Sequence, residues 1–438
     1  MKIIELIFCF LLTSIQSQIV FQFSKKSSYD KNINFFLYHR ENELYTNINI
    51  GTPKISIPLK LTFNYSPCAL RGTKLNGIYN ETNSKTFYLK DKFVWIFSSE
   101  IFNSGSYSVD TIYLKDYSQN DIIYDNFNFI LATDIDKKKN FPNGIIGLKF
   151  QDTPLVRNQS LIFYLKENNL IENNCFTIKF DKKNNNEGYL IIGNYPHEYD
   201  TKYIIKYFQN TNIKIFYYES PYWTIEFDSI IWNNISFEKN KNIRFVLDIN
   251  TIIVTKDYLG VFDEYFKEFN NTCKKNTYKN NTENQIYFTC DSSFNIKEFP
   301  SIKFTNKFLN YTFILDSNDL FIKDENTYLF LIIFDLQSRK YWEIGSLFLK
   351  KYQLVYDFDK KIIGFYTNIE DEQKIINPTS KFPFLFYLSI IFGFIIIILG
   401  IILYKLFILL PKKKRANELS DVYEYISDNT TRSSNIIN

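Results

Sequence analysis

The chain has 438 residues, of which 45% are hydrophobic and 22% are charged, so it can bury a core and global disorder is excluded. The formal net charge is +4, and four cations form one cluster at 412–415, which argues against a nucleic-acid binder. We therefore examine the chain for targeting segments and for a folded, non-nucleic-acid-binding domain.

The two ends of the chain predict export and membrane anchoring. Residues 1–17 have the order of a secretory signal, with Lys2, an apolar run and then small polar residues up to Ser17. The uncharged stretch 382–404 is long enough for a bilayer core, which needs about 20 apolar residues. Because the cluster 412–415 follows it, we predict a single-pass transmembrane helix at 382–410 and a cytoplasmic tail at 411–438.

This topology places residues 18–381 in the lumen of the secretory or endolysosomal system or outside the cell. Four cysteines remain there after signal removal, which is an even set in an oxidising compartment and predicts two disulfides. The Asn-x-Ser/Thr triplets predict a glycoprotein. The predicted glycosylation sites are Asn80, Asn158, Asn234, Asn270, Asn280 and Asn310. Whether the tail motif at 423–426 is a sorting signal stays open.

The exported part consists of short runs rich in Ile, Phe and Tyr, which polar clusters separate. Two stretches, 161–168 and 258–269, instead place apolar residues on one side at helical spacing. This pattern predicts an all-β or mainly β fold, a sandwich or a barrel. The predicted strands are 45–50, 56–63, 93–97, 111–114, 127–131, 189–192, 223–227, 245–247, 354–358 and 362–366.

Most common catalytic signatures are absent from the sequence. His39 and His197 are the two histidines, and neither belongs to a His-Glu-x-x-His motif. The sequence also lacks Gly-x-Ser-x-Gly, Gly-x-Gly-x-x-Gly and the phosphate-binding loop. We therefore expect no metal and no cofactor.

One pattern occurs twice. The segments 50–53 and 57–63 are followed by Ile-Ile-Gly-Leu at 145–148, and 245–251 is followed by Ile-Gly-Ser-Leu-Phe at 344–348. Together with 222–230 and 342–352, these segments resemble the pepsin-like aspartic peptidases. The resemblance implies a bilobed fold with two six-stranded-barrel-like lobes. The implied parts are an N-terminal segment at 18–44, lobes at 45–205 and 206–368, and a juxtamembrane linker at 369–381.

The family's chemistry uses two carboxylates, one from each lobe, that share a proton and a water. Asp248 occupies the second of these positions, in a loop that reads Asp-Ile-Asn-Thr. Thr62 occupies the first, so the resemblance implies a degenerate catalytic motif. Phe63 and Ile249 stand where the family has threonines that bond across the lobes, and neither side chain can form such a bond.

The resemblance also implies the roles of other residues. Asn64 and Asn250 stand at the family's glycine positions, where we expect positive φ, and both are expected to bind substrate together with Thr251. The segment 97–100 occupies the approximate place of the flap tyrosine. The family's second-lobe disulfide corresponds to Cys273 and Cys290, which leaves Cys68 and Cys175 as a second pair by elimination.

We therefore expect a monomeric, membrane-anchored member of the aspartic-type endopeptidase family that binds a peptide or protein ligand but is a pseudopeptidase. One alternative is an active endopeptidase in which Asp248 works with another acid, for which Glu100 is the candidate. A second alternative is a surface receptor or adhesion glycoprotein that uses the fold as a scaffold. A cleft filled by Phe63 and Tyr65 would favour that scaffold.

Overall fold

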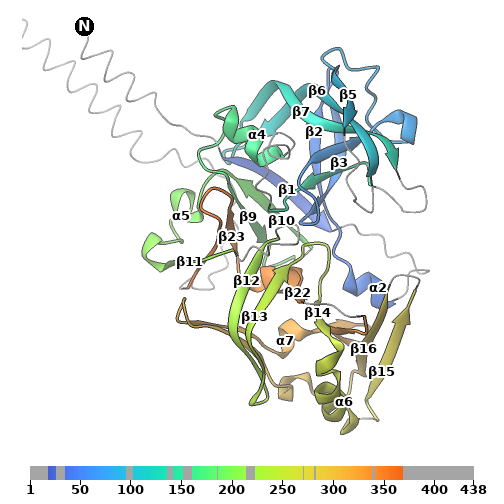
Figure 1. Cartoon of the computed structure of the whole chain (residues 1–438), viewed down its shortest axis with the longest axis vertical. Helices are drawn as coiled ribbons and strands as arrows, with labels where there is room; N and C mark the ends of the chain where they lie inside the picture. Colours follow the sequence, from blue (N-terminus) through green and yellow to red (C-terminus); the bar gives the residue numbers. More distant parts are fainter. Residues whose placement is uncertain are drawn as a thin grey trace, which may run out of the picture. The chain divides into compact units, whose positions relative to one another are not determined.

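The computed structural model describes residues 18–25, 35–94, 102–135, 142–150, 160–184, 186–213, 222–269, 271–280, 283–337 and 341–367. Within these ranges the chain is mainly β, with short helices at the edges of the sheets (Figure 1). The predicted signal, linker, membrane helix and tail lie outside the described residues. Among the residues that are described, no helix is both long and apolar enough to cross a bilayer.

The first sheet has thirteen strands and contains all the strands that precede β12. The strand β1 pairs with both β10 and β2, so it joins the middle of the sheet to the N-terminal lobe. In spatial order the strands are β11 (Phe208–Asn212), β24 (Ile362–Tyr366), β23 (Val355–Asp357), β9 (Cys175–Phe180), β10 (Glu187–Ile192), β1 (Ile19–Lys25), β2 (Leu44–Ile50), β3 (Ile55–Thr62), β8 (Gly144–Gly147), β4 (Cys68–Arg71), β7 (Asp121–Ile135), β6 (Phe102–Lys115) and β5 (Tyr88–Val94).

The second sheet has eleven strands and forms the C-terminal lobe. Its order is β18 (Tyr311–Leu315), β17 (Ile302–Asn306), β12 (Thr224–Trp232), β13 (Ile235–Phe245), β22 (Trp342–Ile344), β14 (Ile252–Thr255), β21 (Ile332–Asp335), β16 (Asn284–Asp291), β20 (Thr327–Phe330) and β19 (Phe321–Asp324), with β15 (Cys273–Lys279) paired to β16.

Helices are short and peripheral. The two predicted helices are confirmed as α4 (Leu161–Glu167) and α6 (Leu259–Lys267). The other α-helices in the described ranges are α2 (Phe35–Arg40), α5 (Pro196–Tyr199), α7 (Ser317–Leu320) and α8 (Ser346–Lys351). Single 3₁₀ turns occur at Thr73–Leu75, Ile205–Tyr207, Lys256–Tyr258 and Ile296–Glu298.

The sheet arrangement corrects one expectation. The N-terminal lobe has the expected barrel-like ring of six strands, β2-β3-β8-β4-β7-β6, which closes because β2 also pairs with β6, but β1 connects this ring to the central hairpins in one larger sheet. The same sheet takes in β11, β23 and β24, which belong to the range 206–368 that we assigned to the C-terminal lobe. The lobe boundary in the sequence is therefore not the boundary between the sheets.

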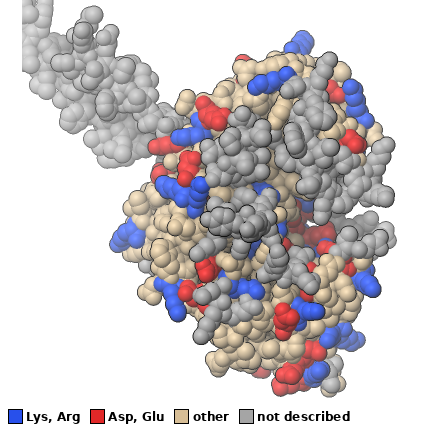
Figure 2. Space-filling model, viewed as in Figure 1, with Lys and Arg blue, Asp and Glu red and all other residues tan. Residues whose placement is uncertain are grey.

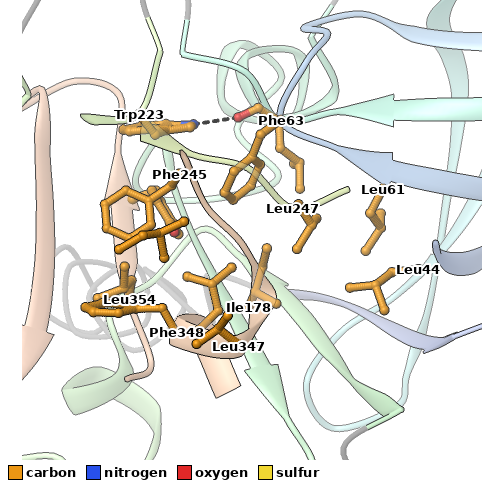
Figure 3. Packing of buried hydrophobic residues seen from close by; sticks show 14 of the residues in the cluster. Leu44, Leu61, Phe63, Ile178, Trp223, Phe245, Leu247, Leu347, Phe348 and Leu354 are labelled. Carbon is orange, nitrogen blue, oxygen red and sulfur yellow. Dashed lines mark hydrogen bonds between the residues drawn. The ribbon is translucent and has the colours of Figure 1, made fainter. Parts of the chain in front are cut away.

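Apolar side chains from both halves of the chain pack into one core (Figure 3). Phe63 and Trp223 are each 1% exposed, and Trp223 Nε1 donates a 2.6 Å hydrogen bond to the carbonyl oxygen of Leu148. Figure 3 shows Phe245 and Phe348 from the C-terminal half in the same cluster. The core thus holds the loops that end β3 and β13 against each other.

The repeated sequence pattern corresponds to one topology that occurs twice. In the first half β8 lies parallel to β3 and antiparallel to β4, and in the second β22 lies parallel to β13 and antiparallel to β14. Both crossings need glycine. A Cβ on Gly147 would stand 2.5 Å from the Tyr65 carbonyl oxygen, and one on Gly345 would stand 2.3 Å from that of Ile249. This explains the glycines in 145–148 and 344–348.

One of the two predicted disulfides is present and the other is not. Cys273 and Cys290 form the disulfide that the resemblance implied, at directly opposed positions of β15 and β16. The predicted Cys68–Cys175 pairing is wrong, because both thiols are free and buried. Cys68 belongs to the main apolar cluster, while Cys175 packs in a separate aromatic cluster with Tyr195. Burial raises the pKa of the Cys68 thiol to about 12, so it is unreactive at neutral pH.

Among the predicted glycosylation sites, three described asparagines lie on the surface. Asn234 and Asn310 occupy left-handed turn positions, and Asn280 directly follows β15. Asn80 is half-buried. Asn158 and Asn270 lie outside the described residues, so their placement stays a prediction. On the face shown in Figure 2, basic and acidic side chains are interspersed.

Candidate functional site

The structure brings Thr62 and Asp248 together across the two lobes. Thr62 ends β3, and Asp248 lies in the loop after β13. The Thr62 hydroxyl donates a 2.7 Å hydrogen bond to Asp248 Oδ2 and accepts one of 3.0 Å from the backbone N–H of Asn64. The two positions that the sequence assigned to the catalytic pair are therefore adjacent, with a hydroxyl in place of the first carboxylate.

Lys60 adds a cation to the site, next to Asp248. Residues 57, 59 and 61 of β3 face the core, so Lys60 shares the other face with Thr62. Its ammonium lies 3.3 Å from Asp248 Oδ1 and 3.3 Å from Glu43 Oε1. Burial acts to lower the pKa of Lys60, but the Asp248 and Glu43 carboxylates outweigh it and raise that pKa above its ordinary value. Lys60 therefore stays a cation and holds Asp248 in an ion pair.

Asn64 completes the contacts to Asp248. Its side-chain N–H donates 3.1 Å to Asp248 Oδ2, and its carbonyl oxygen accepts 2.7 Å from Arg244 Nη2. Arg244 in turn forms a 3.3 Å ion pair with Glu343. This chain of polar contacts replaces the cross-lobe threonine bonds that Phe63 and Ile249 cannot form.

The segment after α2 fixes the backbone of the Asp248 loop. The Asn42 N–H donates 2.9 Å to the Asp248 carbonyl oxygen, and the Asn42 side chain donates 3.0 Å to that of Leu247. The Asn250 N–H donates 2.7 Å to the Arg40 carbonyl oxygen. Because Arg40 itself binds Glu283 and Gln285, this segment is tied to the C-terminal lobe.

Phe63 lies in the core and not in the cleft. Its ring contacts Phe176 and Tyr356 edge to face, at centroid distances of 6.0 and 5.2 Å. Tyr65 is half-buried and packs against the small cluster around Ala69. The observation that would have favoured a scaffold with a plugged cleft is therefore not present.

Two of the predicted substrate-binding residues are buried, so their role in binding stays a prediction. Asn250 is 4% exposed, and its carbonyl oxygen accepts hydrogen bonds from Ser346 Oγ and Lys350 Nζ, both of 2.9 Å. Thr251 is fully buried, and its hydroxyl finds no partner among the described residues. Asn64, the third of these residues, is half-buried. The positive backbone φ that we expected at Asn64 and Asn250 is not present at either residue.

Sequence reasoning missed Lys60, Glu43 and Arg244. A signal for Lys60 existed, because a lysine two residues before the substituted position must share its face on a strand. The sequence contains no comparable signal for Glu43 and Arg244, since only the three-dimensional fold brings them to the site. The flap-like segment 97–100, with the rival acid Glu100, lies outside the described residues. Within the described part of the chain, no second carboxylate contacts Asp248.

This geometry defines a class of protein, a two-lobed β fold with an aspartate loop at the junction of its lobes. The family model of the eukaryotic aspartyl proteases matches residues 43–368, which is most of the chain. The chain therefore belongs to that family. The match begins at the residue that pairs with Lys60 and ends beyond β24.

Individual relatives are distant. The chain is similar to plasmepsin IV of Plasmodium falciparum (isolate 3D7), at 23% identity over 68% of this chain, and spans only 62% of that relative's length. It is also similar to plasmepsin VI of Plasmodium berghei (strain Anka), at 25% identity over 72% of this chain and 73% of the relative. The activities of these relatives come to this chain only as proposals.

Solved structures agree with the fold. Basic 7S globulin from soybean is 14% identical, with a TM-score of 0.58 over 81% of this chain and 97% of its own. Conglutin gamma, a basic 7S globulin from lupine seeds, is 15% identical, with a TM-score of 0.60 over 81% of this chain and 96% of its own. At these identities the likeness shows the pepsin-like bilobed fold alone.

Proposed function

We propose that this protein is a membrane-anchored pseudopeptidase that binds peptides at the junction of its lobes without hydrolysing them. The observation that carries the proposal is that side chains of the protein itself bind both carboxylate oxygens of Asp248. One carboxylate oxygen accepts from Thr62 and Asn64, and the other pairs with Lys60. Both carboxylate oxygens are therefore engaged by side chains of the protein itself.

The chemistry supports the same conclusion. An aspartic peptidase needs one carboxylate as the base and one carboxylic acid as the donor to the scissile carbonyl. Thr62 carries a hydroxyl that is no acid in the range where such pairs work. The Lys60 ammonium also forms an ion pair with Asp248 Oδ1. The site therefore lacks the acid, and its base is engaged.

The active-endopeptidase alternative has no supporting observation at the described site, because the nearest carboxylates are paired with cations. Glu43 binds Lys60, and Glu343 binds Arg244. Peptide binding is supported by the family membership and by Asn64, which is half-exposed beside Asp248. We therefore propose that the protein binds peptides, as its family does, but does not hydrolyse them.

The first prediction tests hydrolysis. The purified full chain in detergent should show no pepstatin-inhibitable cleavage of a fluorogenic peptide library between about pH 3 and 6, because a proton-sharing pair needs two acids. An Asp248→Ala variant should give the same baseline. Cleavage by the wild type that Asp248→Ala abolishes would instead establish an active enzyme.

The second prediction tests the anchoring, which rests on the uncharged stretch 382–404 and the following cations. An epitope placed after Asn438 should be reached by antibody only in permeabilised cells, and one after Gln18 in intact cells or in sealed lumenal compartments. We further propose that the exposed Asn234, Asn280 and Asn310 carry glycans, which a glycosidase-induced mobility shift would report. The reverse epitope pattern would refute both the signal and the anchor.

A further inference from the structure

Two adjacent isoleucines are exposed on the surface between α5 and β11. Ile204 is 46% exposed and Ile205 is 66% exposed, and Lys206, which follows them, is exposed as well. Lys206 Nζ lies 4.6 Å from the centroid of the Tyr207 ring, and no acidic residue occurs in 201–207. Single exposed apolar side chains are ordinary, but here two neighbours form one apolar point with a basic and an aromatic neighbour. We call residues 204–207 the Ile-Ile turn.

The Ile-Ile turn has a fixed base. The Tyr207 N–H donates 2.9 Å to the Ile204 carbonyl oxygen, which closes the turn. On either side of the two isoleucines, Tyr203 and Phe208 pack against the ring of Tyr366, at centroid distances of 4.8 and 5.1 Å. Because these flanking side chains hold the backbone against the protein, the two isoleucines stay at the surface and do not fold into the core.

The chain leaves the folded part beside this turn. Thr367, where the described residues end, donates to the Tyr207 carbonyl oxygen from its N–H at 3.2 Å and from its hydroxyl at 3.3 Å. It directly follows β24, which pairs along its whole length with the edge strand β11. Figure 1 shows α5 and β11 together at one edge of the folded part. The Ile-Ile turn is therefore an exposed apolar group next to the point from which the chain continues toward 382–404.

The length of chain beyond Thr367 keeps the folded part close to a bilayer. Residues 368–381 separate Thr367 from the uncharged stretch 382–404 that we propose as the membrane helix. A chain of that length spans at most about 50 Å, so it holds the folded part near the lipid without deciding which face meets it. Contacts with the lipid then decide the face, and apolar side chains beside the exit of the chain are within reach. Isoleucines next to a lysine and a tyrosine are also typical of segments that lie in the membrane interface.

We propose that the Ile-Ile turn inserts into the surface of the membrane in which the chain is anchored. This inference rests on the proposed membrane anchoring and adds which surface of the folded part meets the lipid. Ile204 and Ile205 enter the boundary between headgroups and acyl chains, about 5–10 Å deep, while the Lys206 ammonium stays among the phosphates. The partner is therefore a lipid surface, and the contact adds the burial of two isoleucines to the hold of the single helix.

The test uses the full chain in phosphatidylcholine vesicles, with an environment-sensitive fluorophore on Ile205→Cys. Cys68 and Cys175 are buried, and burial raises the pKa of both thiols, so the labelled wild-type chain gives the background. We expect a blue shift of the emission on reconstitution, and loss of the emission when the lipid carries a nitroxide near its headgroup. The matched control is Ile78→Cys, which should show neither change. Ile78 is 50% exposed and follows β4, far from the β11 edge in the strand order.

A charge beside the probe assigns the quenching to the turn. Ile204→Asp in the Ile205→Cys chain should weaken it, because a carboxylate is costly to remove from water. Quenching that Ile204→Asp leaves unchanged, or that is equal at Ile205 and Ile78, overturns this inference. Absence of quenching at both positions, in a chain that floats with the vesicles after an alkaline wash, overturns it and leaves the anchoring intact. A chain that the wash removes from the vesicles overturns the anchoring and the inference together. A blue shift without quenching that grows with the amount of protein per vesicle would mean that a second copy covers the turn, which also overturns the inference.

Discussion

Changing Thr62 to Asp and Lys60 to Met in the same chain should give acid-dependent, pepstatin-sensitive peptide hydrolysis, at least about 100-fold above Thr62→Asp alone. The reason lies in the contacts of Asp248. A carboxylate at position 62 would stand where the hydroxyl now lies 2.7 Å from Asp248 Oδ2, so two adjacent carboxylates would share a proton. The Asn64 N–H is already aimed at that position.

Thr62→Asp alone should stay nearly silent because Lys60 remains. The ammonium 3.3 Å from Asp248 Oδ1 would keep that oxygen in an ion pair, where an aspartic peptidase needs the carboxylates to hold the shared proton and the water. Methionine at position 60 keeps the length of the side chain and removes its charge. Glu43, which would lose its ion pair, still accepts from the Tyr45 hydroxyl at 3.3 Å.

Cleavage of a fluorogenic peptide between about pH 3 and 6, with and without pepstatin, is the measurement, and Lys60→Met alone is the control because it has one acid. Strong activity from Thr62→Asp alone would show that Lys60 does not suppress the pair. A folded double variant without activity or pepstatin binding would mean that the junction is closed to ligands.

The structure also corrects what a rebuilt site requires. The sequence suggests restoring the family's threonines at Phe63 and Ile249. Phe63 is 1% exposed between Phe176 and Tyr356, so Phe63→Thr would leave a cavity and cost on the order of 3 kcal/mol. The contacts of Thr62, Asn64 and Lys60 already join the lobes. A rebuilt enzyme should therefore keep Phe63.

The parts of the fold that could be predicted are those with a local signal. The strand 56–63 alternates apolar and polar residues, and α6 has apolar residues at helical spacing, so both were predicted near their observed bounds. The repeated Ile-Gly segments indicated two related halves, and they lie at the two crossings, where a Cβ at either glycine would meet a backbone oxygen. These features depend on few neighbours in the sequence.

Features decided by tertiary pairing were missed. The strand β15 reads Cys-Lys-Lys-Asn-Thr-Tyr-Lys and has no strand pattern, yet it pairs along its whole length with β16, to which the disulfide ties it. The even number of cysteines likewise favoured a Cys68–Cys175 bond. This prediction was wrong because the number of cysteines does not tell which of them lie close together in the fold. At the site, Asp248 and Thr62 were predicted from the family pattern, but the pairing of Asp248 with Lys60 needed the three-dimensional fold.

Removing the Lys350 ammonium should stabilise the folded chain at acid and neutral pH. Lys350 lies one residue before the end of α8 and is half-buried, with its ammonium 2.9 Å from Asn250 Oδ1 and 5.6 Å from the centroid of the Phe180 ring. Burial, and then Lys25, lower the pKa of Lys350 to about 7. In Lys350→Met, Asn250 Oδ1 keeps the bond from Ser346 Oγ, so no buried acceptor is orphaned.

The sign of the pH dependence follows from that pKa. The unfolded chain holds the Lys350 proton up to its ordinary value near pH 10.5, whereas the folded chain releases it near pH 7, so folding is penalised below pH 7 and the penalty disappears as the pH rises between these values. Lys350→Met should therefore raise the free energy of unfolding by on the order of 3 kcal/mol at pH 6 and change it little at pH 10.

Urea unfolding followed by fluorescence, with the disulfide intact, measures this free energy. The neighbouring Lys351→Met is the control, since Lys351 pairs with Asp316 and Asp319 and its removal should not stabilise the chain. An equal gain at pH 6 and pH 10 would show that methionine acts through packing, and a loss at pH 6 would show that the buried ammonium is stabilising.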